Sequence, residues 1–398
     1  MNILYISTFS SDRVVNDIYK KTGANPGFAI QKFARMLAHG FIKNGASVTA
    51  LSYPPILVNY VSRLKFIVNF KNERQDGISF LYIPIINIPV IKNIYVFLYV
   101  FFYVLFWGIF NRKDKVIICD VLTIGASMGT LLASKLNKVK VIALVTDIFG
   151  LIIGSTSFKA RVAAKLNQWY VKLFDLYVFL TEQMNPKINI LHKPYIVMEA
   201  LCDSQMHNDH NNISIKKSNP RVVLYAGGIY EQYGLKMLAE AFILANIPNA
   251  KLVYYGTGPY VEEYKRMCER YTNLEYRGVA DNKTVMLEEY RATLLVNPRL
   301  SNEEYTQYSF PSKNMEFMSS GTPLLTTALP GMPREYYPYV FLFKDETLEG
   351  FAMSLKEVLS RSDADLALFG YKARSFVLDN KNNIKQAARI LTFIKNNL

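Results

Sequence analysis

Short apolar strands that alternate with amphipathic helices are the feature that most constrains the fold of this chain. In the first such unit, a strand at residues 3–7 is followed by a helix over 28–44 and a strand at 47–51, and Gly45 ends the helix. Further apolar strands are predicted at residues 78–83, 116–119, 139–145 and 176–180, with a helix containing Gly125 and Gly129 after the second of these. Strands connected in this way form mainly parallel sheets, whose ligands collect at the carboxyl ends of the strands.

The second half of the chain repeats this pattern after a polar stretch. Residues 203–220 are rich in Asn, Ser and Lys and lack periodicity, which is typical of a surface linker between domains. Strands are then predicted at residues 221–226 and 251–255, each followed by a glycine pair and a helix, and an apolar stripe marks a last helix at about 381–397. We therefore expect a first domain at 1–203, a linker at 204–220, a second domain at 221–378 and a C-terminal helix at 379–398.

One short helix of the second domain has the features of an anion site. Pro311 fits its first turn, where the missing N–H costs nothing. The free N–H groups of Ser312, Lys313 and Asn314 can then face a phosphate, with the Lys313 ammonium close by. Glu316 lies one turn further along, where a carboxylate can accept hydrogen bonds from paired sugar hydroxyls. The segment predicts a site for a nucleotide diphosphate.

This segment resembles the donor-site signature of retaining nucleotide-sugar glycosyltransferases of the GT-B fold. In that signature a glutamate, seven residues and a second glutamate precede a Gly-x-Pro turn, which here is residues 321–323. Glu316 matches the second glutamate, and Tyr308 stands in place of the first. The sequence Phe-Pro-Ser-Lys at 310–313 is similar to that of the family 4 branch of capsular and O-antigen enzymes. The resemblance implies an α/β chain of two Rossmann-like domains with mainly parallel sheets, and a C-terminal helix that crosses back to the first domain.

The glycine turns of the second domain also match the family's order of parts. Gly227-Gly228 and Gly256-Thr-Gly258 follow two predicted strands, where absent side chains allow the backbone to approach a ligand. Tight structural turns would require the same glycines. The resemblance places both pairs in the donor site.

Charged residues that relatives use to hold the diphosphate are missing from two positions. Relatives often have an Arg and a Lys where this chain has Gly228 and Tyr233. Lys313 and Arg299 are our candidates to supply the lost charges, although an exposed loop arginine would explain Arg299 equally. Arg277 lies where relatives hold the base through backbone groups, so its side chain says little about which nucleotide binds.

Two loops of the first domain are candidates for the acceptor side of the site. The polar loop at 10–26 is predicted to be flexible, and Gly23 and Gly27 match a family loop that approaches the donor phosphate or the acceptor. A plain loop is the alternative. Asp147 follows a strand at the place where many relatives carry a histidine that contacts the donor sugar. Its carboxylate could orient the acceptor hydroxyl or receive its proton, or it could only cap a helix.

The net charge of +14 is concentrated in the first half of the chain. Residues 1–200 contain 23 Lys+Arg and 10 Asp+Glu, and residues 201–398 contain 23 and 22. The uncharged aromatic run at 94–110 lies between Lys92 and the basic residues Arg112, Lys113 and Lys115. Such a run could be a helix that is packed on the sheet and dips into a membrane interface, a wholly buried helix, or a membrane span. We expect the first, on an anionic surface, because a span would break the domain.

No metal or cofactor is predicted, and the nucleotide sugar is a substrate. Cys119, Cys202 and Cys268 are far apart, which suits reduced thiols in a cytoplasmic protein. His207 and His210 lie in an Asn-rich stretch and read as solvated residues rather than zinc ligands. The start of the chain, residues 1–8, reads as a strand rather than a signal peptide.

The resemblance implies a retaining glycosyltransferase of the hexosyltransferase type. It would move a sugar from a nucleotide diphosphate, expected to be UDP, to a polyprenyl-linked or glycan acceptor in bacterial surface polysaccharide synthesis. It would act in the cytoplasm, attached peripherally to the inner face of the membrane. The alternatives are a degenerate, non-catalytic partner subunit and a nucleotide-sugar 2-epimerase on the same fold. Nucleic-acid binding is not expected, because the basic half contains no recognition module.

Overall fold

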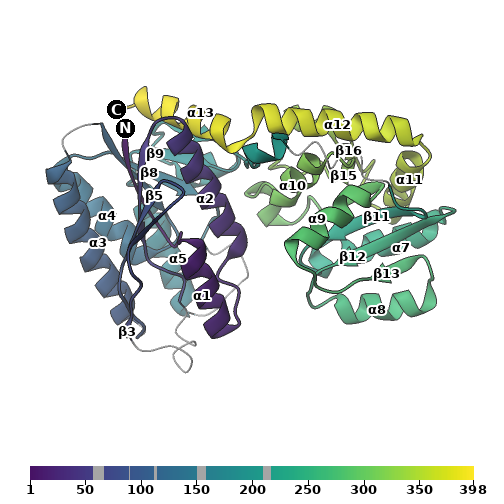
Figure 1. The fold of residues 1–398 in the computed structure, drawn as a ribbon, viewed down its shortest axis with the longest axis horizontal. Coiled ribbons are helices and arrows are strands. Elements are labelled where there is room, and N and C mark those ends of the chain that lie inside the picture. The colour runs from purple at the N-terminus through teal and green to yellow at the C-terminus, as the bar shows by residue number, and fades with distance from the viewer. Residues whose placement is uncertain (57–66, 89, 112–113, 150–157, 209–216) are drawn as a thin grey trace. The chain divides into compact units, whose positions relative to one another are not determined.

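The computed structural model describes residues 1–56, 67–88, 90–111, 114–149, 158–208 and 217–398. They form two compact units, one of Met1–Leu201 with Asn383–Leu398 and one of Cys202–Asn382 (Figure 1). Arg112 and Lys113 of the predicted basic flank, His210, and residues 209–216 of the predicted linker lie outside the described residues.

The first unit is built on an eight-stranded sheet with the order β10-β9-β8-β7-β1-β2-β5-β4. Its pairs are parallel from β10 through β5, and β4 joins the edge antiparallel to β5. Ile3 of β1 is in register with Val48 on one side and Val116 on the other. The elements are β1 (Asn2–Ser7), α1 (Asp12–Thr22), α2 (Phe28–Lys43), β2 (Ser47–Ser52), β3 (Ile67–Val68), β4 (Glu73–Gln75), β5 (Ile78–Tyr82), β6 (Ile85–Ile86), α3 (Ile91–Phe110), β7 (Lys115–Asp120), α4 (Ile124–Asn137), β8 (Val141–Val145), α5 (Phe158–Val171), β9 (Leu176–Phe179), α6 (Met184–Ile188), β10 (Tyr195–Val197) and α13 (Asn383–Lys395).

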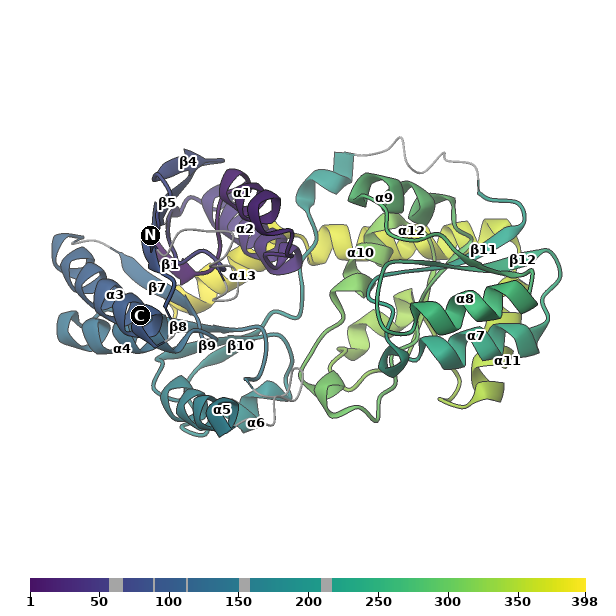
Figure 2. The same cartoon turned by 90° about the horizontal axis from the view of Figure 1, so that it is seen from below.

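Helices cover both faces of this sheet. Helices α1, α2 and α13 lie on one face, and α3, α4 and α5 lie on the other (Figure 2). Helix α13 is held to α2 by two amide hydrogen bonds: Asn383 Nδ2 donates to the Met36 carbonyl at 3.0 Å, and Asn44 Nδ2 donates to the Ile384 carbonyl at 2.9 Å. The predicted return of the C-terminal helix to the first unit is confirmed.

The prediction of a flexible loop at residues 10–26 is wrong, because this segment contains helix α1. The Ser11 hydroxyl caps the helix by accepting a hydrogen bond from the Val14 N–H. Val14, Val15 and Ile18 are buried, whereas most of the other side chains of the helix are charged or polar. This apolar stripe is too narrow to stand out in a polar sequence.

Helices α3 and α4 pack with their backbones unusually close together. A Cβ atom on Gly125 would lie 2.5 Å from the Asn93 carbonyl oxygen, and one on Gly129 would lie 2.6 Å from that of Phe97. Val96, Val100 and Val104 of α3 are buried, while the side chains on the opposite side of the helix are exposed. Helix α3 is therefore not wholly buried. It is also long and apolar enough to cross a membrane by length and composition.

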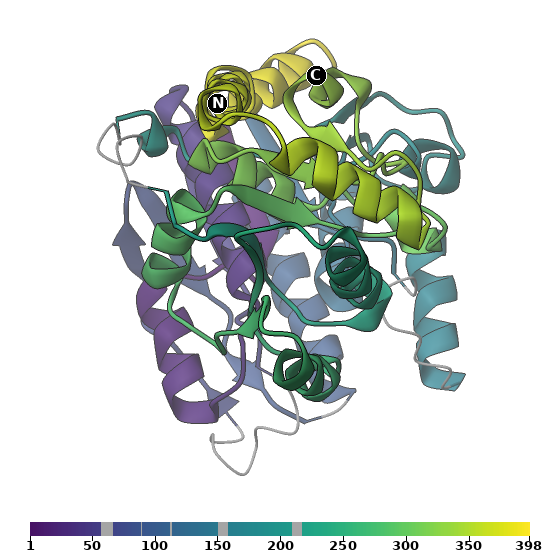
Figure 3. The same ribbon diagram turned by 90° about the vertical axis from the view of Figure 1, so that its right-hand side faces the viewer.

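The second unit contains a six-stranded parallel sheet with the order β13-β12-β11-β14-β15-β16. Helices again lie on both faces, with α7, α8 and α11 in one group and α9, α10 and α12 in the other (Figures 1 and 3). The elements are η2 (Ser204–Asn208), β11 (Arg221–Ala226), η4 (Glu231–Tyr233), α7 (Leu235–Ala245), β12 (Ala250–Tyr255), α8 (Val261–Arg270), β13 (Leu274–Tyr276), α9 (Asn282–Arg291), β14 (Leu294–Asn297), η5 (Glu304–Gln307), α10 (Ser312–Ser320), β15 (Leu324–Thr326), η6 (Arg334–Tyr339), β16 (Phe341–Leu342), α11 (Leu348–Leu359) and α12 (Asp363–Asn380).

Lys217, at the end of the predicted linker, is fixed to the second unit. Its ammonium donates hydrogen bonds to the carbonyls of Tyr290 and Ala292 and to the Thr322 hydroxyl, each at 2.9 Å. Burial lowers the pKa of this lysine to about 8. The strand that follows, β11, has the predicted bounds.

Candidate functional site

The predicted anion-binding helix is α10, and it begins one residue later than expected. Pro311 has an extended backbone and occupies the N-cap, so the helix starts at Ser312. The Asn314 N–H is not free, because it donates to the Pro311 carbonyl at 2.9 Å. In the described part of the chain, the N–H groups of Ser312 and Lys313 have no acceptor. These two donors and the positive end of the helix dipole suit the predicted anion site, and anion binding there remains a prediction.

A buried amide network holds α10 against the carboxyl end of the sheet. Asn297, the last residue of β14, donates from Nδ2 to Asn314 Oδ1 at 2.6 Å. Asn314 Nδ2 donates to Thr326 Oγ1 at 3.3 Å, and this hydroxyl donates to the Asn297 carbonyl at 3.0 Å. This network was not predicted from the sequence. The pattern that could have indicated it is the polar residue at the end of each apolar strand.

Lys313 and Glu316, both predicted site residues, form an ion pair with each other. Lys313 Nζ donates to Glu316 Oε2 at 2.9 Å, and the two side chains are 31% and 23% exposed. The ammonium also lies 5.8 Å from the centre of the Phe317 ring. Both charged ends are therefore held near the first turn of α10. A bound diphosphate would offer Lys313 a second negative partner.

The glycines that follow β11 and β12 let two loops pack directly on each other. A Cβ atom on Gly256, whose φ is +131°, would lie 1.8 Å from the Gly227 carbonyl oxygen. One on Gly258 would lie 2.1 Å from the Ile229 carbonyl oxygen. The Gly228 carbonyl accepts a hydrogen bond from the Tyr225 hydroxyl at 2.9 Å. Close packing between the loops thus accounts for Gly256 and Gly258, and their contact with a donor remains a prediction.

Arg299 lies between two aromatic rings. Its guanidinium carbon is 4.6 Å from the centre of the Tyr233 ring and 6.0 Å from that of Tyr305. The Arg299 Nε and the Tyr305 hydroxyl are both buried without a hydrogen-bond partner among the described residues. A buried donor without an acceptor is costly, and an anion would satisfy both groups. The resemblance places a lysine of relatives at the position of Tyr233. Here the Tyr233 ring instead packs against Arg299, whose positive charge comes from another loop.

The structure gives less direct support for Arg277 and Tyr308 as donor-binding residues. Arg277 donates to Glu275 at 2.6 Å and to Glu288 at 2.5 Å, so its charge is already paired. Tyr308 follows η5 as its C-cap, and its N–H donates to the Tyr305 carbonyl at 3.1 Å. It is half-buried and lies four residues before α10 in the chain. Their roles toward a donor remain predictions.

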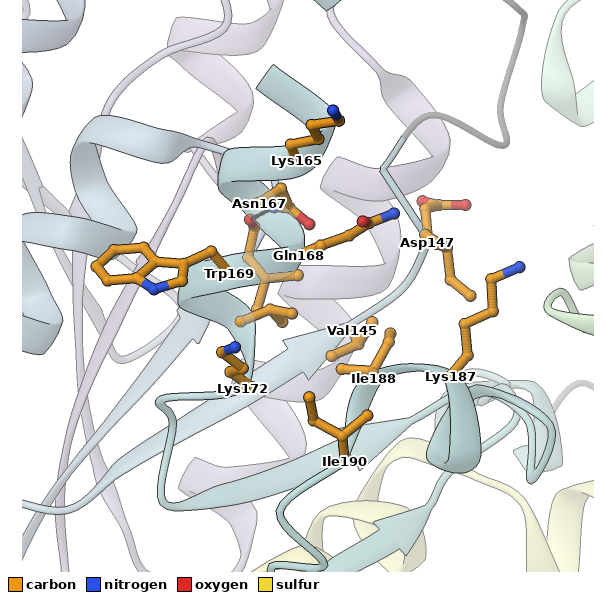
Figure 4. Close-up of a pocket in the computed structure, with 13 residues that line it drawn as sticks. Val145, Asp147, Lys165, Asn167, Gln168, Trp169, Lys172, Lys187, Ile188 and Ile190 are labelled. Atoms are coloured by element: carbon orange, nitrogen blue, oxygen red, sulfur yellow. Dashed lines mark hydrogen bonds between the residues drawn. The ribbon is translucent and has the colours of Figure 1, made fainter. Parts of the chain in front are cut away.

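In the first unit, Asp147 lines a cavity of about 510 Å³ at the carboxyl end of β8. Figure 4 shows Asp147 and Lys187 on one side of this pocket and Trp169 and Lys172 on the other. Burial raises the pKa of Asp147 to about 6. A carboxylate with such a pKa can accept a proton near neutral pH.

A second carboxyl group, which was not predicted from the sequence, lies at the end of the neighbouring strand. Asp120 ends β7, and its Oδ1 accepts a hydrogen bond from the Leu122 N–H at 2.9 Å. Burial raises its pKa to about 6, and its charge in turn raises the pKa of Asp147. Since β7 and β8 are adjacent and parallel, both carboxyl groups lie at the carboxyl ends of the strands, on the same side of the sheet. In the sequence, an Asp at the end of an apolar strand could have indicated this second carboxyl group.

Gly23 and Gly27 flank the short connection between α1 and α2. Gly23 is the C-cap of α1 with φ 69°, and Gly27 is the N-cap of α2 with φ 81°. Side chains rarely adopt these backbone angles, so helix ends explain both glycines. Contact with a donor or an acceptor remains a prediction. Among the described residues, no three His, Cys, Asp or Glu side chains gather as a metal site would require.

The chain resembles known proteins in both sequence and fold. Residues 207–376 match the family model described as glycosyl transferases group 1. No sequence among curated proteins matches significantly. The fold is similar to that of sucrose-phosphate synthase from Thermosynechococcus elongatus, at 13% identity and a TM-score of 0.66, covering 100% of this chain and 99% of that one.

Two further structures match along the full length of both chains. The Anabaena protein HepE in complex with UDP has 14% identity and a TM-score of 0.64. The lipopolysaccharide outer core galactosyltransferase WaaB has 13% identity and a TM-score of 0.62. These likenesses and the two mainly parallel sheets confirm the predicted architecture. The chain has the GT-B fold of the group 1 glycosyltransferases, and the whole segment that matches that family's model lies within its second unit.

Proposed function

We propose that this chain transfers a sugar from a nucleotide diphosphate to a lipid-linked or glycan acceptor, with retention at the anomeric carbon. The N-terminus of α10 carries the proposal, because free N–H groups, Lys313 and Glu316 meet there within the segment that matches the family. HepE was solved with UDP and with UDP-glucose, which supports a UDP-sugar as donor. The hexosyl type of donor is part of the proposal.

Charge stabilisation is the main catalytic effect in this proposal. Negative charge grows on the diphosphate as the glycosidic bond breaks, and the helix N-terminus and Lys313 stabilise that charge more than the ground state. Arg299 adds a third positive group when its unpaired Nε meets the diphosphate. In a retaining reaction the leaving phosphate can itself receive the acceptor proton. These groups supply the charge without a divalent metal, so we expect turnover to persist in EDTA.

The surface of the first unit and one similar structure support the proposed acceptor and pathway. Exposed apolar side chains of α3 and the basic first half of the sequence support a lipid-linked acceptor at an anionic membrane. WaaB, a lipopolysaccharide enzyme with the same fold, supports a role in surface polysaccharide synthesis. The protein would then act at the cytoplasmic face of the membrane as a peripheral enzyme.

A non-catalytic partner subunit is the second candidate function. Tyr308 replaces a glutamate of the family, Thr146-Asp147 replaces a histidine, and Gly228 and Tyr233 replace two cations. Such a subunit would bind the nucleotide sugar without turnover. Release of UDP from a UDP-sugar in the presence of a lipid extract separates the two functions.

The test of the donor site uses two variants of α10. We expect Glu316→Gln to weaken donor binding by about 1.5–3 kcal/mol, because a neutral amide replaces a charged acceptor of the ribose hydroxyls. Lys313→Ala should lower kcat more than it weakens donor binding, since the diphosphate charge is largest after the bond breaks. Calorimetry with UDP and a UDP-release assay measure both effects.

The matched control breaks another ion pair of the second unit. Lys344 and Glu357 lie 2.9 Å apart on an exposed surface, and Lys344→Ala should leave UDP affinity unchanged. If Glu316→Gln binds UDP as the wild type does, Glu316 is not part of the site. If Lys313→Ala turns over at the wild-type rate, Lys313 is a solvated helix residue.

A further inference from the structure

The pocket beside Asp147 has an apolar floor and a cationic rim. The floor is lined by branched aliphatic side chains from the strand ends, α5 and the α6 region: Val121, Val145, Ile148, Val171, Ile188 and Ile190. The rim contains Lys165, Lys172 and Lys187, together with the side-chain amides of Asn167 and Gln168. With a volume of about 510 Å³, the cavity is large enough for a substrate group.

The charges that face this pocket are mainly positive. Its titratable lining groups are the three lysines and Asp147, which gives three positive charges against one carboxyl group. Lys165 and Lys172 have no carboxylate partner in the described part of the chain. Figure 4 shows the ammonium of Lys187 directed toward the side of the pocket that holds Asp147. A phosphate would find several donors at the rim.

The pocket opens next to exposed apolar side chains. Trp169 is 49% exposed, and Ile190 and Leu191 are 54% and 53% exposed. Helix α5 packs beside α4 on the face of the sheet that also carries α3. An apolar chain that leaves the pocket would therefore meet apolar surface on this side of the unit.

We propose that this pocket binds the phosphate of an isoprenoid or other alkyl phosphate and thus holds the lipid-linked acceptor of the proposed glycosyl transfer. The phosphate lies among the three lysines, and the first carbons of the chain lie on the aliphatic floor. Asp147, at the same pocket, faces the end of the acceptor that bears the hydroxyl. The inference rests on the proposed function, but it concerns the first unit and not the nucleotide site of the second.

Binding of geranyl phosphate to the full chain, measured by calorimetry, tests the proposal. The variant Lys165→Gln, Lys172→Gln, Lys187→Gln should bind geranyl phosphate about tenfold or more weakly, because it loses charge-assisted hydrogen bonds. The matched control removes three other lysines of the first unit, Lys20, Lys32 and Lys43, which are exposed on α1 and α2. It should lose less than about twofold, since those charges are distant and screened.

Two further arms identify which part of the ligand is recognised. Inorganic phosphate and geraniol should each bind about tenfold or more weakly than geranyl phosphate, because each lacks one half of the recognised group. Ile190→Asp, at an exposed aliphatic position of the pocket lining, should weaken geranyl phosphate binding further than the binding of inorganic phosphate. Vesicles of phosphatidylglycerol should not compete for the pocket if the ligand is a single alkyl phosphate rather than a bilayer headgroup.

Three results would overturn the proposal. One is equal binding of geranyl phosphate by wild type and the pocket variant, and another is equal loss in the control variant. The third is equal affinity for inorganic phosphate and geranyl phosphate, which would leave the aliphatic floor without a role. UDP binding is measured in the same samples, so that loss of the donor site is distinguished from failure of the acceptor pocket.

Discussion

At the scale of single residues, the ring of Tyr233 packs against the guanidinium of Arg299, at a position where the family resemblance leads one to expect a lysine. Tyr233 cannot hold a diphosphate by charge, but its ring lies 4.6 Å from the Arg299 guanidinium. Stacking of this kind fixes the plane of the guanidinium and leaves its N–H groups available. If Arg299 binds the diphosphate, it compensates for the charge that Tyr233 lacks.

We predict that Arg299→Ala weakens UDP binding by about 1.5–3 kcal/mol and leaves uridine binding unchanged, because uridine has no diphosphate. Arg361→Ala is the matched control, since Arg361 also stacks on an aromatic ring, with its guanidinium 5.0 Å from the centre of the Phe341 ring. Calorimetry with both ligands gives the comparison. An equal loss for UDP and uridine would mean that Arg299 only supports the loop.

The pKa of Asp147 predicts a pH dependence of both stability and activity. Burial raises this pKa from 3.8 to about 6. Between these two pH values the folded state therefore keeps a proton that the unfolded state has lost. The contribution of Asp147 to the free energy of unfolding is therefore largest below about pH 4 and falls by about 3 kcal/mol as the pH rises to above 6.

Asp147→Asn should remove this part of the pH dependence, which denaturant titrations of both proteins at about pH 4.5 and pH 7.5 would measure. The rate of transfer should also fall below about pH 6 in the wild type if the ionised carboxylate orients or deprotonates the acceptor. Asp120→Asn removes the neighbouring charge that raises the pKa of Asp147, so it should shift the rate profile to lower pH rather than abolish the dependence. A wild-type rate profile in Asp147→Asn would exclude Asp147 from the reaction.

At the scale of elements, the buried strands were the most predictable part of the structure. The prediction for β11 is correct to the residue, and that for β8 starts two residues early, because a parallel strand covered on both faces is a continuous apolar run. Helix α1 was missed since only one narrow stripe of it is apolar. The predicted last helix begins two residues later than expected, at Asn383, and α12 precedes it.

In the candidate site, too, contacts between neighbouring residues could be predicted from the sequence, and contacts between distant segments could not. The pairing of Lys313 with Glu316 follows from their spacing on one helix, so the sequence placed both in one site. Contacts of Arg299 with Tyr233, and of Asn297 with Asn314, join segments far apart in the chain. They depend on the order of strands in the sheet, which a single sequence does not contain.

The glycine contact between α3 and α4 is an element-scale prediction. Gly129→Ala would place a Cβ atom 2.6 Å from the Phe97 carbonyl oxygen, so the two helices must move apart. We expect a loss of about 1–3 kcal/mol in the free energy of unfolding, as for other overpacked positions. Leu136→Ala, at a site on α4 that is 62% exposed, should change stability by less than about 0.5 kcal/mol. Equal unfolding midpoints for Gly129→Ala and the wild type would show that the helices separate without cost.

At the scale of the whole molecule, charge and apolar surface combine in the first unit. Residues 1–200 contain 23 Lys+Arg against 10 Asp+Glu. Helix α3 exposes Ile94, Leu98, Phe102, Phe106 and Phe110, which recur every fourth residue, and α4 adds Leu132 and Leu136. We call these seven side chains the α3–α4 surface. Because α3 is packed on α4 through its other side, this surface suits a helix that lies in the membrane interface.

Flotation with vesicles should resolve two independent contributions to membrane binding. Replacing Phe102 and Phe106 by Ser should weaken binding at every salt concentration, since apolar burial is not screened. Replacing Lys135, Lys138 and Lys140, which are exposed at and after the end of α4, by Gln should remove only the salt-sensitive part, at about 1 kcal/mol per charge. The Lys20, Lys32 and Lys43 variant again serves as the charge-matched control and should float as the wild type does.

If wild-type protein does not bind anionic vesicles and extracts without detergent, the α3–α4 surface is not a membrane contact. A soluble glycan would then be the better acceptor, unless the pocket beside Asp147 binds geranyl phosphate.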